Sequence, residues 1–130
     1  MPVSTSETPK SIGMKDAALF RQQVYINGKW LDADSGETTV ITNPSTGEVL
    51  GTVPNCGASE AKRAIEAANE AWPKWRSKTA KERAVIMRRW YELMMENQEA
   101  LARLMTAEQG KPLTESRGEI SYAASFIEWF

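Results

Sequence analysis

The chain has 130 residues, of which 42% are hydrophobic and 25% are charged, a composition typical of a folded domain. Its net charge is −1 and its basic residues are interleaved with acidic ones, which argues against a nucleic-acid partner. It has no run of about 18 to 20 apolar residues that could span a bilayer, so we expect no membrane partner. One cysteine and no histidine exclude an internal disulfide and the usual zinc ligands, which fits a reducing cytoplasm.

The first 18 residues are rich in Ser, Thr, Pro and Lys and lack the apolar run of a signal peptide. We expect residues 1–18 to be a flexible polar tail, because they offer few apolar side chains to bury. Residues 19–130 would then form one folded unit. That length is too short for a cofactor domain plus a catalytic domain.

Two strand pairs are predicted after the tail. Asn27-Gly28 favours the positive φ angles that a two-residue type I′ turn requires, so a β-hairpin is predicted around it. The turn residues from Asn43 to Gly47 predict a second strand pair on either side, closed by Pro54. The predicted strands are Val24-Tyr25-Ile26, Lys29-Trp30-Leu31, residues 38–42 and residues 48–53.

From residue 59 the apolar residues recur with a period near 3.6, which predicts helices. The first helix is expected to begin at Ser59 and to end at Pro73, because proline interrupts a helix. Thr79 and Glu82 have the spacing of a capping box and predict the start of a second helix. The expected buried stripes are Ala61, Ala64, Ile65, Ala68 and Trp72 in the first helix, and Ile86, Trp90, Leu93 and Met94 in the second.

Two further helices complete the prediction. Asn97 is expected to end the second helix or to cap the third, and Gly110 to end the third in a left-handed conformation. Thr114 is expected to cap the fourth helix. The fold class is therefore α/β, with an N-terminal hairpin and strands followed by about four helices. The fourth helix carries two apolar stripes, one of Ile120, Ala123, Ala124 and Ile127 and one of Tyr122, Phe126 and Phe130. Because it ends on bulky apolar residues, we expect it to continue in a longer parent protein.

Four motifs, in the same order and spacing, resemble the aldehyde dehydrogenase superfamily. Segment 25–30, Y-I-N-G-K-W, resembles the opening hairpin I-N-G-x-W, and segment 42–49, T-N-P-S-T-G-E-V, resembles N-P-x-T-G-E. Segment 67–75 is similar to the A-x-x-A-x-x-x-W motif, and segment 106–113, T-A-E-Q-G-K-P-L, to T-x-E-x-G-K-P. Residues 118–130 look like the bacterial succinate-semialdehyde dehydrogenase branch.

The resemblance implies a parent enzyme of which this chain is the N-terminal part, the opening of a Rossmann-like cofactor domain. Such a parent oxidises succinate semialdehyde to succinate with NAD or NADP, as a cytoplasmic homo-oligomer, dimer or tetramer, in γ-aminobutyrate degradation. In the family a cysteine thiolate attacks the aldehyde, hydride passes to the nicotinamide, and a glutamate-activated water hydrolyses the thioester. The alternatives are glutarate semialdehyde or a betaine-type aldehyde as substrate, or a free-standing helical interaction module without catalysis.

The catalytic motifs of the family, W-N-F-P, G-S-T-x-x-G, E-L-G-G and G-Q-x-C, do not occur in these 130 residues. We therefore expect the chain alone to be inactive, with no catalytic residue, no cofactor-binding residue and no bound cofactor. Cys56, in an Asn-Cys-Gly context, is interpreted as an ordinary loop cysteine. The glycines Gly28, Gly47 and Gly110 are interpreted as turn and cap residues, since they form no phosphate-binding pattern.

Two weaker site predictions follow from the resemblance. The fourth helix runs beside the aldehyde access tunnel in the family, so Tyr122, Phe126 and Phe130 are candidates to line it; core packing is the alternative. A main-chain carbonyl near Ile41 and the carboxylate of Glu108 are candidate ligands of a monovalent cation, which would need more oxygens from outside the chain. The alternative for Glu108 is a solvated or lysine-paired carboxylate.

Overall fold

The computed structural model describes residues 12–130, and residues 1–11 of the predicted tail lie outside the described part. Within the described part, Ile12 is only 2% exposed and packs in an apolar cluster with Leu50 and Ala107. A short 3-10 turn follows at Ala17–Leu19. Packed structure therefore begins before residue 19, because Ile12 covers the end of a helix that lies almost a hundred residues later in the chain.

Both predicted strand pairs are confirmed. Strands β1 (Val24–Ile26) and β2 (Lys29–Leu31) form an antiparallel hairpin in which Tyr25 pairs with Trp30. Asn27 and Gly28 at its turn have φ angles of 50° and 76°, as a type I′ turn requires. Strands β3 (Thr38–Thr42) and β4 (Val49–Pro54) form a second antiparallel pair, with a register shift between Ile41 and Thr42.

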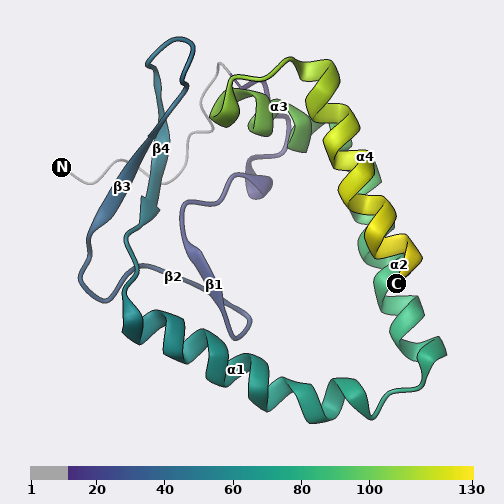
Figure 1. Cartoon of the computed structure of the whole chain (residues 1–130). Helices are drawn as coiled ribbons and strands as arrows, with labels where there is room; N and C mark the ends of the chain where they lie inside the picture. Colours follow the sequence, from purple (N-terminus) through teal and green to yellow (C-terminus); the bar gives the residue numbers. More distant parts are fainter. Residues whose placement is uncertain (1–11) are drawn as a thin grey trace.

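Helix α1 (Ala58–Arg76) differs from its prediction in three ways. It begins after Gly57 rather than at Ser59. It also continues through Pro73, which only removes one N–H donor near the exposed C-terminal end of the helix. The predicted buried stripe is wrong, because Ile65 is 70% exposed and Trp72 is 54% exposed. In Figure 1, α1 extends along one edge of the molecule, apart from the other three helices.

Helix α2 (Ala80–Glu96) is capped by Thr79, as predicted: the Thr79 hydroxyl accepts from the Glu82 N–H at 3.2 Å, and the Glu82 carboxylate accepts from the Thr79 N–H at 2.7 Å. Its predicted buried stripe is wrong for Ile86, Trp90 and Leu93, which are 45%, 54% and 41% exposed. The half-buried residues of α2 are Arg83, Met87, Tyr91, Met94 and Met95.

Helices α3 (Gln98–Gln109) and α4 (Leu113–Trp129) complete the chain. Asn97 ends α2 and also precedes α3, and Gly110 ends α3 with a left-handed φ of 73°, as predicted. Thr114 is not the cap of α4, because the Pro112 carbonyl already accepts the first N–H groups of the helix, from Glu115 and Ser116. Helix α4 packs against both α2 and α3 (Figure 1).

Two small buried regions hold these elements together. The first is the cluster of Ile12, Leu50 and Ala107, with Ile41 and Leu104 packed against it. It joins the β3–β4 pair to α3. The second lies where α4 packs against α2 and α3, and the buried residues there are Ala102, Ser116, Ile120 and Ala124. The predicted α/β class, strands followed by four helices, is confirmed.

Candidate functional site

The turn between β3 and β4 meets the turn between α3 and α4. Asn43 shapes the first turn, because its side-chain oxygen accepts from the Ser45 N–H at 2.9 Å and its carbonyl accepts from the Gly47 N–H at 2.8 Å. A Cβ on Gly110 would lie only 2.9 Å from Pro44 Cγ and 3.2 Å from Ser45 Oγ. The segments that resemble N-P-x-T-G-E and T-x-E-x-G-K-P are therefore in direct contact.

The candidate cation ligands lie close to this junction. Ile41 packs against the cluster that contains Ala107, the residue before Glu108. Desolvation raises the pKa of the Glu108 carboxyl above its usual value. The ammonium group of Lys111, the nearby lysine in the sequence, pairs with Glu119 at 2.9 Å. Residues 12–130 contain no group of three metal-ligating side chains, so the cation site stays a prediction.

The candidate tunnel residues of α4 lie on its exposed side. Tyr122, Phe126 and Phe130 are 64%, 48% and 85% exposed, and the first two rings are in edge-to-face contact at 4.9 Å. Phe126 and Phe130, with Trp129, Ser125 and Glu128, line an open hollow of about 540 Å³. Core packing within the described chain is excluded for this stripe. In the other apolar stripe of α4, Ile120 and Ala124 are buried, whereas Ala123 is exposed.

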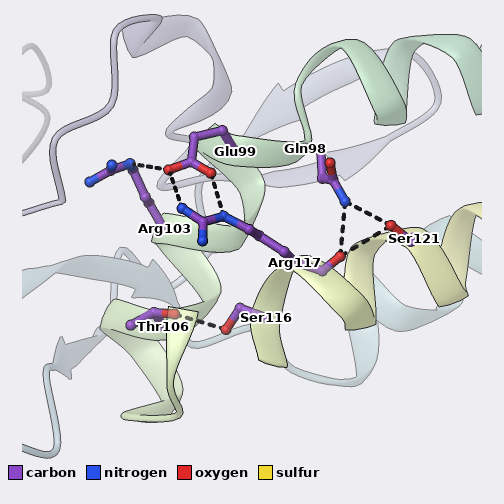
Figure 2. Close-up of polar contacts among 7 residues, drawn as sticks. All are labelled: Gln98, Glu99, Arg103, Thr106, Ser116, Arg117 and Ser121. Carbon is purple, nitrogen blue, oxygen red and sulfur yellow. Dashed lines mark hydrogen bonds and ion pairs between the residues drawn. The ribbon is translucent and has the colours of Figure 1, made fainter. Parts of the chain in front are cut away.

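A polar network joins α3 to α4 (Figure 2). The Gln98 amide donates to the Arg117 carbonyl at 3.0 Å and to Ser121 Oγ at 2.7 Å. The Arg117 guanidinium donates to both carboxylate oxygens of Glu99, at 2.7 and 3.1 Å. At the other end of α3, the hydroxyls of Thr106 and Ser116 are 2.8 Å apart, and Ser116 is fully buried.

The charges of this network reinforce each other. The hydrogen bond from Arg117 lowers the pKa of Glu99, and the same bond raises the pKa of Arg117. Arg103 also donates to Glu99, at 2.9 Å. Both groups therefore stay ionised at neutral pH, and the link between α3 and α4 is a two-point contact with a fixed geometry.

A second polar network fixes the start of α1. Glu60 is 4% exposed, and its carboxylate accepts from the Asp34 N–H at 2.7 Å and from the Gly57 N–H at 2.9 Å. These hydrogen bonds lower the Glu60 pKa to about 2. The Asp34 carboxylate in turn receives two hydrogen bonds from Arg63, at 2.7 and 2.8 Å. The loop after β2 is thus tied to the first turns of α1.

Neither network is predicted by the sequence patterns. Glu60 could have been found as the third residue of a helix that begins after Gly57, the position where a carboxylate reaches back to the cap. The assumed start at Ser59 concealed that spacing. The partners of Gln98 and Arg117 lie 18 or more residues away, and no local pattern marks them. Cys56 is exposed and Gly28, Gly47 and Gly110 have positive φ, in agreement with their predicted roles.

Comparison with known proteins identifies the family to which these motifs belong. Residues 30–130 match the model of the aldehyde dehydrogenase family. The chain belongs to the aldehyde dehydrogenase family. It is 69% identical over 117 residues to glutarate-semialdehyde dehydrogenase of Pseudomonas putida. It is 64% identical over 117 residues to succinate-semialdehyde dehydrogenase [NADP(+)] of Escherichia coli. Each match covers 90% of the chain and 24% of the relative.

Solved structures give the same assignment. The crystal structure of an E. coli NADP-dependent enzyme matches with a TM-score of 0.88 and 64% identity. That of succinate-semialdehyde dehydrogenase from Burkholderia pseudomallei matches with a TM-score of 0.87 and 60% identity. Both matches cover 89% of this aldehyde dehydrogenase chain but only 24% of the solved chains. The chain thus spans about a quarter of the length of these relatives. Within residues 12–130, none of the helices could cross a membrane.

Proposed function

We propose that the chain is the N-terminal part of the cofactor-binding domain of a cytoplasmic, NAD(P)-dependent aldehyde dehydrogenase that oxidises succinate semialdehyde to succinate. The observation that carries this proposal is the structural match at 64% identity, which covers 89% of the chain and 24% of a much longer enzyme. On this proposal the nucleophilic cysteine and the cofactor-binding loop belong to the rest of the parent protein, and residues 1–130 alone do not catalyse the reaction.

The exposed apolar side chains support this proposal. Ile65 and Trp72 on α1, Trp90 on α2 and Phe130 on α4 are between 54% and 85% exposed. Apolar surface of this extent in a monomer commonly marks a contact with another domain or chain. We propose that the parent enzyme covers these faces, and that the parent forms a homo-oligomer, a dimer or a tetramer.

Glutarate semialdehyde is the second candidate substrate, favoured by the 69% identity to the P. putida enzyme. It differs from succinate semialdehyde by one methylene group, and both molecules carry an aldehyde at one end and a carboxylate at the other. Recognition of that carboxylate calls for an arginine with a free guanidinium edge. We assign that arginine to the rest of the enzyme.

Two site assignments belong to this proposal. Tyr122, Phe126 and Phe130 line the path of the aldehyde, since their rings lie on the exposed side of α4. The Ile41 carbonyl and the Glu108 carboxylate contribute to a monovalent cation site, supported by the packing of Ile41 near the end of α3.

A chimera tests the proposal. Residues 1–130 replace the matching N-terminal segment of the E. coli succinate-semialdehyde dehydrogenase. The chimera is expected to reduce NADP with succinate semialdehyde, because residues 1–130 then complete the fold of a family enzyme. The matched control is the isolated 130-residue chain, which is expected to be inactive. Reduction of NAD or NADP by the isolated chain would contradict the proposal that the catalytic residues belong to the rest of the parent protein.

A further inference from the structure

The most deeply buried side chains of α3 and α4 are small. Ala102, Ser116 and Ala124 are all fully buried, and Ile120 is the one large apolar residue among the buried positions of the two helices. Helices are normally kept in register by large side chains that interlock as ridges and grooves. Small side chains let two helices approach closely, but they resist sliding and rotation only weakly. Directional contacts between the two helices therefore contribute to the register of α4 on α3.

The polar network supplies such directional contacts, and they lie at both ends of α3. Gln98 and Glu99 bind α4 from the first turn of α3, and Thr106 binds it from the last turn. A displacement of α4 by one helical turn, about 5.4 Å, would break all of these links at once. A rotation of α4 about its axis would break these links as well, since the groups that α4 contributes, from Ser116, Arg117 and Ser121, lie on one side of the helix.

Gln98 has a particular place in the network. Both hydrogens of its amide are used, one for the Arg117 carbonyl and one for Ser121 Oγ. The Ser121 hydroxyl also donates to the same carbonyl, at 3.2 Å, so the three groups form a closed triangle (Figure 2). These contacts are partly buried, whereas those of Arg117 with Glu99 are exposed and open to competition from water.

We propose that Gln98 is a positioning residue that sets the rotation and register of α4, and thereby the direction in which Tyr122 and Phe126 point. Ser121 precedes Tyr122 directly, so a change at Ser121 moves the first ring of the stripe. The consequence for the aldehyde rests on the proposed function, in which this stripe lines the substrate path. The consequence for the geometry of α4 does not.

Spin-label distances in the full 130-residue chain test the geometric part. Cys56 is changed to Ser, and labels are attached to Cys at the exposed positions Gln109 and Ala123. The labelled chain without further substitutions is expected to give a single narrow distribution of distances between the two labels. Gln98→Leu, which keeps the size and removes both donors, is expected to give a broad or two-peaked distribution. Ser121→Ala, a milder change that removes one acceptor, is expected to give an intermediate width.

Ile120→Val is the matched control, because it weakens the apolar packing of α4 and leaves the polar links intact. It is expected to lower the unfolding temperature while keeping the narrow distribution. Gln23→Leu is the same chemical change at an exposed site on another part of the chain. It is expected to alter neither the unfolding temperature nor the distance distribution. A narrow distribution in Gln98→Leu, or equal broadening in Ile120→Val, would overturn the proposal.

Kinetics of the chimera described above test the consequence for the substrate. Gln98→Leu is expected to raise the KM for succinate semialdehyde severalfold and to leave the KM for NADP unchanged. Ser121→Thr, which restores the hydroxyl lost in Ser121→Ala, is expected to return the KM for the aldehyde toward the parent value. If the parent chimera is active and Gln98→Leu leaves the KM for the aldehyde unchanged, Gln98 does not position the stripe. A folded but inactive parent chimera would instead overturn the proposed function.

Discussion

Gly110 lies so close to Pro44 that a Cβ at position 110 would be 2.9 Å from Pro44 Cγ. The same residue has a φ of 73°, a conformation that side chains with a Cβ rarely adopt. Two independent requirements for glycine therefore coincide where the β3–β4 turn meets the end of α3. This contact adds to the cluster of Ile12, Leu50 and Ala107 in holding the strands against the helices.

Replacement of Gly110 tests that contact. Gly110→Ala is expected to lower the free energy of unfolding by about 1 to 3 kcal/mol, from the left-handed φ and from crowding against Pro44. Gly118→Ala is the matched control, because Gly118 lies within α4 and has open space around its Cβ position. It is expected to raise the free energy of unfolding by about 0.5 to 1 kcal/mol. Denaturant titration of both variants measures the two effects, and changes of the same sign would contradict this assignment.

The Glu60 carboxylate makes a pH-dependent contribution to stability. Its pKa is lowered from 4.5 to about 2, first by the hydrogen bond from the Asp34 N–H. A group whose pKa falls on folding stabilises the folded chain above its unfolded pKa, and this contribution disappears as pH falls. We expect the stability supplied by Glu60 to be complete above pH 4.5 and to be lost between pH 4.5 and about 2.

Glu60→Gln is expected to make the free energy of unfolding depend less steeply on pH within that window. Carboxyl carbon NMR should find the Glu60 titration midpoint near pH 2. Arg63→Gln serves as control, since it removes the partner of Asp34 and leaves the two backbone donors of Glu60 in place. A Glu60 midpoint at the ordinary value of 4.5 would show that these hydrogen bonds do not form in solution.

Thr79 and Thr114 give a paired test of helix caps. Thr79 accepts from the Glu82 N–H, whereas α4 begins after Pro112 with no side-chain cap. Thr79→Ala is therefore expected to lower the free energy of unfolding by about 1 kcal/mol. Thr114→Ala is expected to change it by less than about 0.5 kcal/mol. Equal losses in thermal or denaturant unfolding would return Thr114 to the capping role that the sequence pattern predicts.

Local patterns predicted much of the fold, because their causes are local. Asn27-Gly28, the pair Thr79 and Glu82, and Gly110 each act within about four residues, and the structure confirms all three. Pro73 shows the limit of such rules. Near the exposed end of α1, the loss of one hydrogen bond is too small an effect to stop the helix.

Burial was harder to predict than helix position. The period of the apolar residues identifies the apolar side of a helix, but it does not say whether the described chain covers that side. Ile65 and Trp90 lie on apolar stripes and are exposed, whereas Ile120, which also lies on an apolar stripe, is buried. The contacts of Gln98 with α4 depend on how two helices cross, and sequence spacing alone does not determine that crossing.

The proposal that residues 1–130 are part of an aldehyde dehydrogenase is tested by the rate of NADP reduction in a chimera. In this chimera residues 1–130 replace the N-terminal segment of the E. coli succinate-semialdehyde dehydrogenase. We predict turnover of succinate semialdehyde with a KM close to that of the E. coli enzyme. We also predict no turnover by the 130-residue chain alone. A chimera that folds and binds NADP but does not oxidise the aldehyde would contradict the proposed function.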